Sequence, residues 1–424
     1  MTAGATLGRV MREDYGKVLA VLARRCGDLD LAEDALGEAL ARAAERWPDD
    51  GEPAEPAAWL TTVARNLLVD RARTNPLEVE WTDAINEQAE QVTADAPAEP
   101  GAAEHGEFAL GDDRLRLLFV CCHPSLNQES QMALALRTLC GLTTREIARA
   151  FVQDEAATAQ RLVRAKRKIR EAKIPFEVPE PAQLPERVDT VLAVIYLLFN
   201  EGYLAHETEP PIRSDLCELA IRLGKLTCDL VRRHVEAQAL VALMLLQHAR
   251  RAARVRDHEL VPMEDQDRSL WNADDIRAGL AWLDDAIACH RAARRPPRPY
   301  LLQAAIAALH ARATSSEQTD WPQIAALYEG LHAVLPSAVI ALNGAVAHAM
   351  ANGPREGLRR IALLEAGGQL AGYHLLPAAQ ADLLRRAGDV EQARAAYRRA
   401  LALATQPMER RYLERRLSDL PPTP

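Results

Sequence analysis

Aromatic residues are scarce in this sequence: Phe, Trp and Tyr together make up 4% of its 424 residues. The hydrophobic cores must therefore be built from Leu, Ala, Val and Ile, and the abundance of Ala and Arg with little β-branched patterning predicts an all-α fold. Long apolar runs are also missing, since the longest, which begins near Val191, is about half of the ~20 residues that cross a bilayer. No membrane-spanning segment is expected.

Paired cysteines are missing too. The seven Cys are odd in number and show no CxxC spacing, which together with the lack of a signal peptide predicts a cytoplasmic chain with reduced thiols. The run Cys121-Cys122-His123 invites a metal site, but adjacent helix residues point about 100° apart and no second ligand cluster follows at zinc-site spacing. We expect ordinary helix packing there, with no metal and no cofactor.

Catalytic motifs are absent as well. The chain holds no Ser-His-Asp set, no HExxH and no glycine-rich phosphate loop, so no catalytic residue is predicted and no enzyme is expected. The formal net charge of −9 excludes a protein that is coated in nucleic acid over its whole surface. Any contact with DNA must be confined to a local basic patch.

A basic patch of this kind lies between Leu142 and Lys173 and has the pattern of a helix-turn-helix. Thr143 followed by Glu146 predicts a capping box for the first helix, and Asp154 predicts the N-cap of the second. The second helix has one apolar face, at Thr158, Leu162, Ala165 and Ile169. Its other faces are cationic, which suits a helix that enters the major groove of DNA; the alternative is a solvated basic helix that meets an acidic partner.

Residues 1–75 are expected to form a compact helical domain. Asp30 with Glu33 predicts the start of its second helix. A charged stripe on that helix is formed by Asp34, Glu38 and Arg42. A third helix is expected in the stretch WLTTVARNLLVDRAR, which has apolar residues at helical spacing.

Residues 76–113 change character. They hold eleven Asp and Glu residues and no Lys or Arg, and Pro, Ala and Gly fill much of the remainder. This composition predicts a flexible, self-repelling linker. Two interpretations stay open from the composition alone: a tether, or an acidic segment that occupies a cationic channel.

Two pairs of segments resemble a known family. The first pair is DLDLAEDALGEALARA and AWLTTVARNLLVDRAR, and the second is LALRTLCGLTTREIARAF and QRLVRAKRKIR. In their order and spacing, with the acidic linker between them, they resemble the two conserved regions of bacterial RNA polymerase sigma factors of the extracytoplasmic-function (ECF, sigma-70-like) type. The resemblance covers about 175 residues, and the remainder resembles the long TPR-like C-terminal extension of one ECF group.

The resemblance implies sigma region 2 in residues 1–75. In the family this region binds the clamp helices of the polymerase β′ subunit, which implies polymerase contacts at Asp34 and Glu38. It also opens the −10 promoter element, which implies DNA contacts at Trp59, Arg65, Asn66 and Arg71. Arginines suit phosphates and an aromatic ring can stack on a flipped base, but Trp59 also suits a helical core.

The loop that would read the −10 bases departs from the family. It contains no aromatic residue and no arginine but four acids, Asp49, Asp50, Glu52 and Glu55. The bases that it reads are therefore not implied by the resemblance.

The resemblance implies sigma region 4 in residues 114–175, which would read the −35 element and meet the polymerase β flap. The first turns of a recognition helix reach base edges, and later positions hold phosphates. Base contacts are thus implied for Ala157, Gln160, Arg161 and Arg164, and a backbone contact for Lys168. The linker resembles the sigma segment that threads toward the polymerase active-site cleft, where its carboxylates would mimic phosphates.

Residues 176–290 begin after a proline-rich hinge and are expected to form a helical middle domain. The run Asn200-Glu201-Gly202-Tyr203 is expected to break its first helix. The segment MEDQDRSLW holds a polar cluster with four candidate regulatory residues, Asp265, Asp267, Arg268 and Trp271, next to Glu264. This cluster is a candidate site for a ligand or for the sigma domains; the alternative is a loop fixed by local Asp hydrogen bonds and an Arg pair.

Residues 291–424 contain a weak repeat. Tyr328, Ile361 and Tyr397 are spaced by 33 and 36 residues, and each is followed three positions later by a small or apolar residue. This spacing matches tetratricopeptide (TPR) units, in which two antiparallel helices pack through small residues. Stacked helix pairs of this kind form a concave surface, which predicts a protein partner.

The sequence thus predicts an all-α protein with two small helical sigma domains joined by an acidic linker, a middle domain and TPR-like repeats. Its expected partners are core RNA polymerase, promoter DNA and a protein on the repeat surface, with no membrane. We expect a sigma factor whose extension regulates it. Two alternatives stay open: a helix-turn-helix transcription regulator with a ligand-binding helical domain, and a scaffold whose basic helix meets an acidic protein.

Overall fold

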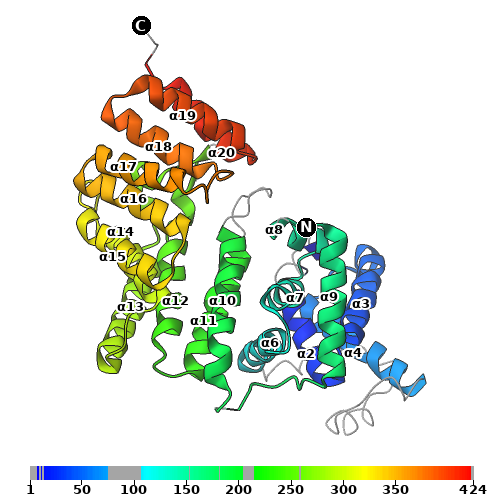
Figure 1. The fold of residues 1–424 in the computed structure, drawn as a ribbon. Helices are drawn as coiled ribbons and strands as arrows, with labels where there is room; N and C mark the ends of the chain where they lie inside the picture. Colours follow the sequence, from blue (N-terminus) through cyan, green and yellow to red (C-terminus); the bar gives the residue numbers. More distant parts are fainter. Residues whose placement is uncertain are drawn as a thin grey trace. The chain divides into compact units, whose positions relative to one another are not determined.

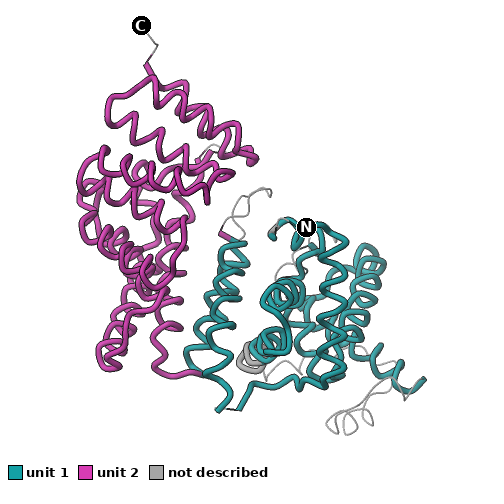
Figure 2. Tube along the Cα trace, viewed as in Figure 1, with its two compact units in different colours: residues 1–202, 214–230 teal, residues 203–213, 231–424 magenta. Residues whose placement is uncertain are grey.

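The computed structural model describes residues 7–8, 11, 14–74, 107–151, 153–180, 182–203, 214–256 and 259–421. Within these ranges the regular structure is helical apart from one two-stranded hairpin, which confirms the all-α prediction. The chain forms two compact units (Figure 2). Unit 1 comprises residues 1–202 and 214–230, and unit 2 comprises residues 203–213 and 231–424, so the boundary falls inside the stretch 176–290.

Unit 1 begins with three helices, α2 (Tyr15–Cys26), α3 (Leu29–Asp50) and α4 (Pro56–Thr74). The side chain of Asp28 caps α3 by accepting hydrogen bonds from the amides of Asp30 and Leu31, at 2.7 and 3.1 Å. The prediction that Asp30 caps this helix is therefore wrong. Because Asp28 satisfies the free amides, the carboxylates of Asp30 and Glu33 are left for partners elsewhere in the fold.

The second part of unit 1 contains α6 (Glu107–Cys121), α7 (Gln128–Cys140), α8 (Thr144–Ala150) and α9 (Glu155–Glu171). Gly141 ends α7 in the left-handed conformation. The two predicted helix starts are confirmed: Thr143 and Glu146 form a capping box, and Asp154 caps α9. Helix α6 begins at Glu107, inside the stretch predicted as linker. The remainder of that stretch, residues 76–106, lies outside the described residues.

The predicted apolar face of α9 is confirmed. Its four residues, Thr158, Leu162, Ala165 and Ile169, are all buried, and α9 packs against α7 and α8. Helix α2 packs in turn against α6 and α7 (Figure 1). The approach is close, since a Cβ atom at Gly16 would lie 2.1 Å from the carbonyl oxygen of Leu139. Only glycine permits it, and the two parts of unit 1 therefore share one packed interior.

Two further helices follow, α10 (Leu184–Tyr203) and α11 (Ser214–Leu230), and α11 packs against α6. Helix α10 continues through residues 200–203, so the predicted break there is wrong. A glycine inside a helix costs only about 1 kcal/mol relative to alanine, and Gly202 is buried, so packing outweighs that local cost.

Unit 2 opens with α12 (Val235–His248). Short elements follow: η2 (Arg251–Ala253), the antiparallel strands β1 (Val255–Arg256) and β2 (Glu259–Leu260), η3 (Met263–Asp265) and η4 (Arg268–Leu270). The helices after them are α13 (Ala273–Ala293), α14 (Pro299–Arg312), α15 (Trp321–Val334), α16 (Ala338–Asn352), α17 (Pro354–Ala366), α18 (Leu375–Ala387), α19 (Val390–Leu403) and α20 (Pro407–Ser418). Each of the helices from α13 to α20 packs on the next one along the chain (Figure 1).

The three repeat positions fall on every second helix of this stack: Tyr328 on α15, Ile361 on α17 and Tyr397 on α19. Ile361 and Tyr397 are buried and Tyr328 packs at the edge of the core. Small residues allow the close packing, because a Cβ atom at Gly357 would lie 2.4 Å from that of Ala349. No helix of the described residues has both the length and the apolar character to cross a membrane.

Candidate nucleic-acid interface

The five side chains predicted to meet the −35 element lie on one surface of unit 1. Ala157, Gln160, Arg161, Arg164 and Lys168 line a hollow of about 680 Å³ between α9 and the segment that leads into α7. Arg161 is half-buried and the other four are exposed. The hollow is open and cationic on the α9 side, which suits a nucleic-acid backbone.

The opposite wall of the hollow was missed by the sequence reasoning. It is formed by the α6–α7 loop and the first turn of α7, and its polar residues are Ser125, Asn127 and Ser130. The side chain of Asn127 caps α7 by accepting a hydrogen bond from the Ser130 amide at 2.9 Å. Helix starts favour anions, so the signal available in the sequence was an Asn N-cap before the helix that supports α9.

Both arginines of the hollow already have partners. Arg161 forms an ion pair with Glu129 at 2.7 Å and a hydrogen bond with Gln153. Arg164 donates to the side-chain oxygen of Gln160 at 3.1 Å, and both side chains are exposed. Arg164 is therefore held over the hollow by a neutral partner, whereas Arg161 must leave a carboxylate before it can bind a phosphate.

Another face of α9 forms ion pairs with α3. The ammonium group of Lys166 lies 2.7 Å from Asp30 and 2.9 Å from Glu33 on α3, and Arg170 lies 3.1 Å from Asp30 and 3.6 Å from Asp28. Burial would lower the pKa of Lys166, but the two carboxylates outweigh it and raise this pKa above its usual value. We call these five residues the α3–α9 ion-pair cluster; it joins the two parts of unit 1.

The acids predicted to bind polymerase lie beside one arginine predicted to bind DNA. Arg71 on α4 is 3.4 Å from Glu38 and 3.9 Å from Asp34, and Arg42 is 2.8 Å from Glu38. Asp34 and Arg42 are exposed and Glu38 and Arg71 are half-buried, so these solvent-accessible pairs contribute little to stability. They are consequently available to a partner at small cost.

The remaining residues predicted at the −10 element are spread along α4. Trp59 is half-buried and packs edge-on against the buried Trp47, with ring centroids 5.5 Å apart. Asn66, seven residues later, shares the face of Trp59 and is exposed, and Arg65 is half-buried. Trp59 therefore combines a packing contact with partial exposure to solvent.

The candidate regulatory residues lie in unit 2. Asp267 caps η4, and hydrogen bonds from the hydroxyl and amide of Ser269 lower its pKa. Arg268 donates to the carbonyl oxygens of His310 and Ala313 at 2.8 and 2.7 Å, and its guanidinium lies over the ring of the buried Trp271. These contacts match the alternative of a locally fixed loop. Asp265 differs, since it is exposed at the edge of a second hollow.

Comparison with known proteins gives family matches in two stretches of the chain. The sigma-70 region 2 family matches residues 10–76, and a family of unknown function, DUF6596, matches residues 187–287. The uncharacterized protein R00370 of Rhizobium meliloti (strain 1021) is 42% identical over 409 residues, which cover 96% of this chain and 94% of that protein.

Two relatives from Mycobacterium tuberculosis carry descriptive names. The probable ECF RNA polymerase sigma factor SigI (strain CDC 1551 / Oshkosh) is 28% identical over 163 residues, 38% of this chain and 52% of its own length. The ECF RNA polymerase sigma factor SigL (strain ATCC 25618 / H37Rv) is 42% identical over 73 residues, 17% of this chain and 41% of its own length. No solved structure matches the chain.

A region 2 domain packed against a helix-turn-helix domain with a basic second helix defines a sigma-type protein, a class that acts in transcription initiation. The chain belongs to the ECF sigma-70-like family and carries a C-terminal extension, which the DUF6596 match marks.

Proposed function

We propose that this chain directs core RNA polymerase to a subset of promoters and that its C-terminal extension regulates this activity. The observation that carries the proposal is the hollow beside α9. All five residues that the family resemblance implies as −35 contacts line this hollow. The resemblance implied them from their positions along the helix, without reference to any hollow. A surface assembled in this way fits the −35 element.

Within this proposal, Ala157, Gln160 and Arg164 meet base edges, and Lys168 holds a phosphate farther along α9. Arg161 joins them once it has left Glu129. The start of α7 supplies an amide-rich helix end for a second phosphate contact.

In region 2, we assign Asp34 and Glu38 to the β′ clamp helices of polymerase and Arg65, Asn66 and Arg71 to the −10 strand. Binding of polymerase at Asp34 and Glu38 would release Arg71 from its ion pairs at the time when DNA arrives. The outer part of the Trp59 ring would stack on an unpaired base.

The arrangement of unit 1 adds a requirement. The −10 and −35 elements are separated by roughly 25 base pairs, which is about 85 Å of duplex at ~3.4 Å per pair. The α3–α9 ion-pair cluster holds the two DNA-binding parts within hydrogen-bond distance of each other. The parts must therefore separate before both elements are bound, and the 32 residues from 75 to 106 can span roughly 100 Å when extended.

The regulatory part of the proposal is supported by the way in which the extension begins. Helix α11 falls inside the DUF6596 match and packs against α6 of the sigma part. The extension thus packs against region 4 through α11, one of its first helices. A change in the extension can therefore reach the promoter-binding part through packed contacts within unit 1.

The assignment of the hollow is tested with Arg164→Ala and a matched control, Arg167→Ala. Both remove one arginine from α9, but Arg164 lines the hollow, whereas Arg167 lies outside its lining and pairs with Glu171 at 2.9 Å. In footprinting of promoter complexes with core polymerase, Arg164→Ala should weaken binding about tenfold or more, because a good base contact is worth roughly 1–3 kcal/mol. Equal promoter affinities of the two variants would contradict the assignment of the hollow to the −35 element.

A further inference from the structure

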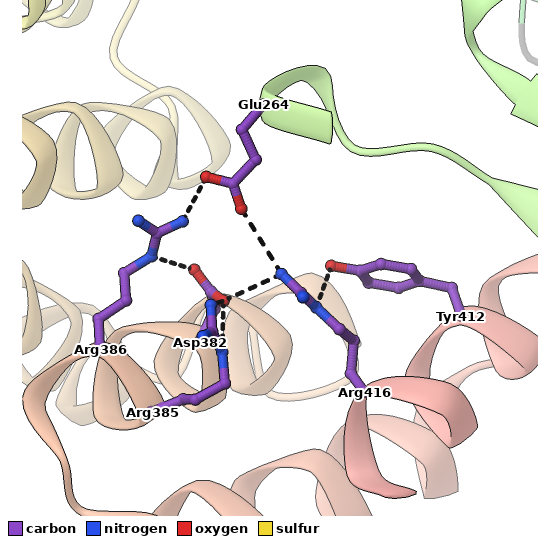
Figure 3. Close-up of polar contacts among 6 residues, drawn as sticks. All are labelled: Glu264, Asp382, Arg385, Arg386, Tyr412 and Arg416. Carbon is purple, nitrogen blue, oxygen red and sulfur yellow. Dashed lines mark hydrogen bonds and ion pairs between the residues drawn. The ribbon is translucent and has the colours of Figure 1, made fainter. Parts of the chain in front are cut away.

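An acidic residue of the MEDQDRSLW segment lies among arginines of the repeat helices. The carboxylate of Glu264, in η3, binds the guanidinium groups of Arg386 on α18 and Arg416 on α20 (Figure 3). In Figure 1 the green hairpin that precedes it lies against α20, and β2 packs on this helix. A second ion pair joins the same elements, between Glu259 and Arg415 at 3.1 Å.

We call Arg385, Arg386 and Arg416 the arginine site. On the repeat helices, one carboxylate serves all three guanidiniums: Asp382 is 2.7 Å from Arg385, 2.7 Å from Arg386 and 3.4 Å from Arg416. Burial would raise the pKa of Asp382, but hydrogen bonds from Arg386 and Arg385 outweigh it and keep this pKa below its usual value. With Glu264 removed, three positive charges would face one negative charge, so the site attracts an anion from outside α18 and α20.

The segment that supplies this anion is fixed at its ends and held by polar contacts in the middle. At one end the amide of Val261 donates to the carbonyl of Arg254 at 2.8 Å, and at the other Trp271 is buried. Between them, η3 contributes no buried residue, and the buried side chain of Gln266 is polar and donates to the carbonyl of Val261 at 3.0 Å. The middle of the segment can therefore leave the arginine site without opening a hydrophobic core.

A second hollow, of about 540 Å³, adjoins the arginine site. Its basic lining comes from Arg256, Arg415 and Arg416, and its acidic lining from Glu259, Asp265 and Asp419. This volume lies within the range of ligand-binding clefts. It offers space for additional chain beside the position of Glu264.

We propose that the arginine site is a binding site for an extended acidic segment of a partner protein, and that residues 259–267 occupy it as an internal competitor. The internal occupant shows the chemistry that the site accepts: a carboxylate with a second acid beside it, on a backbone that is not part of a long helix. A partner segment with several Asp and Glu residues would present the same groups and displace Glu264. The mixed lining of the adjoining hollow would favour a segment that also carries one basic side chain.

This inference deepens the regulatory role proposed above for the extension. Displacement of Glu264 would free η3 while the hairpin stays anchored at Val261, and so convert partner binding into a change within unit 2. Its test is a binding measurement that gives the same answer whether or not the chain initiates transcription.

The experiment uses the full chain and a fluorescein-labelled peptide with the sequence of residues 259–267, ELVPMEDQD. Fluorescence anisotropy is measured for the wild type and for Glu264→Gln, in which the internal competitor loses its charge. We expect saturable binding to both, at least tenfold tighter for Glu264→Gln. A peptide without acidic side chains, QLVPMQNQN, should bind at least tenfold more weakly than the acidic one.

Two further substitutions, made on the Glu264→Gln background, locate the binding. Arg386→Gln should remove peptide binding, and Arg399→Gln should leave it unchanged, because Arg399 on α19 pairs with Glu365 outside the arginine site. Arg385→Gln replaces Arg386→Gln if circular dichroism shows that the latter variant has lost helix. Equal affinity for the peptides with and without acidic side chains, equal affinity of wild type and Glu264→Gln, or loss of binding in Arg399→Gln would each overturn the proposal.

Discussion

At the scale of single residues, one buried carboxylate links two helices of unit 2. Glu236 on α12 is 3% exposed and accepts hydrogen bonds from the amides of Tyr300 and Leu301 at 3.0 and 3.1 Å, so it caps the start of α14 from a distant part of the chain. Arg298, in the N-cap position, makes no side-chain cap hydrogen bond. Two amides at the start of α14, one buried and one partly buried, therefore have Glu236 as their side-chain acceptor.

The Glu236→Ala change should destabilise this contact by about 2 kcal/mol, since it leaves these two amides without their side-chain acceptor. Hydrogen exchange of the α14 peptide should then be about 30-fold faster, because 1.36 kcal/mol corresponds to a factor of ten. Glu317→Ala, at an exposed loop position, is the control and should leave this exchange rate unchanged. Unchanged protection of α14 in Glu236→Ala would contradict the capping role.

A buried histidine gives unit 2 a pH dependence. Burial, assisted by Arg251 and opposed by Asp275, lowers the pKa of His248 to about 4. The neutral ring is thus favoured in the folded state, while the unfolded chain takes up a proton below about pH 6.5. The resulting stability, on the order of 3 kcal/mol, is complete above pH 6.5 and is lost as the pH falls toward 4.

The melting temperature of the wild type should accordingly fall between pH 7 and pH 5, and His248→Gln should show a smaller fall. Glutamine carries no titrating group but keeps a polar side chain of similar length. Identical slopes for the two proteins would show that His248 does not contribute.

At the scale of elements, local patterns predicted α9 well but not its neighbours. The buried face at Leu162 and Ile169 and the cap at Asp154 follow from spacing along the helix, because both depend on residues within one or two turns. From the sequence alone, Lys166 was as good a candidate for a DNA contact as the other basic residues of α9. Its partner Glu33 is 133 residues away, and no local rule identifies such a pair.

The α3–α9 ion-pair cluster predicts a charge-swap result. Lys166→Glu and Glu33→Lys each place like charges together and should loosen the contact between the two parts of unit 1. If these parts must separate on polymerase, each single change should increase the affinity for core polymerase, by up to about tenfold for a partly buried pair. The double variant restores opposite charges between positions 33 and 166, and, because Asp30 still repels a carboxylate at position 166, it should return the affinity part of the way to the wild-type value.

The control for this swap is Arg167→Glu, which reverses a charge on α9 where the partner, Glu171, lies on the same helix. It should not raise the affinity for core polymerase. If the changes in polymerase affinity caused by the two single substitutions add up to the change in the double variant, Lys166 and Glu33 are not coupled.

At the scale of the whole molecule, the fold class and the place of region 2 near the start of the chain were predictable, because helical spacing and the quoted motifs extend over many residues. The division into two units was not. Helices α10 and α11 belong to the compact unit of the sigma regions, although the proline-rich stretch before them indicated a domain boundary at residue 176. Hinge composition reports on the local backbone, whereas the unit boundary depends on which helix faces pack together.

The site shows the same contrast. Positions on one face of α9 were predicted together and line one hollow, but its second wall at Asn127 and Ser130 was missed because it comes from another helix. In the MEDQDRSLW segment, Glu264 was noticed only as a neighbour, and it is the residue that reaches the arginine site. Its partners lie on α18 and α20, more than a hundred residues away.

The central claim, that this chain starts transcription at chosen promoters, is tested most directly by in vitro transcription. Genomic DNA fragments are transcribed with purified bacterial core polymerase, alone, with the full chain, with Arg164→Ala, and with a chain that ends after Leu230 and so keeps unit 1. We predict discrete transcripts with the full chain that core polymerase alone does not make, fewer with Arg164→Ala, and a different yield from the shortened chain. No discrete transcripts and no co-elution of the full chain with core polymerase would contradict the account.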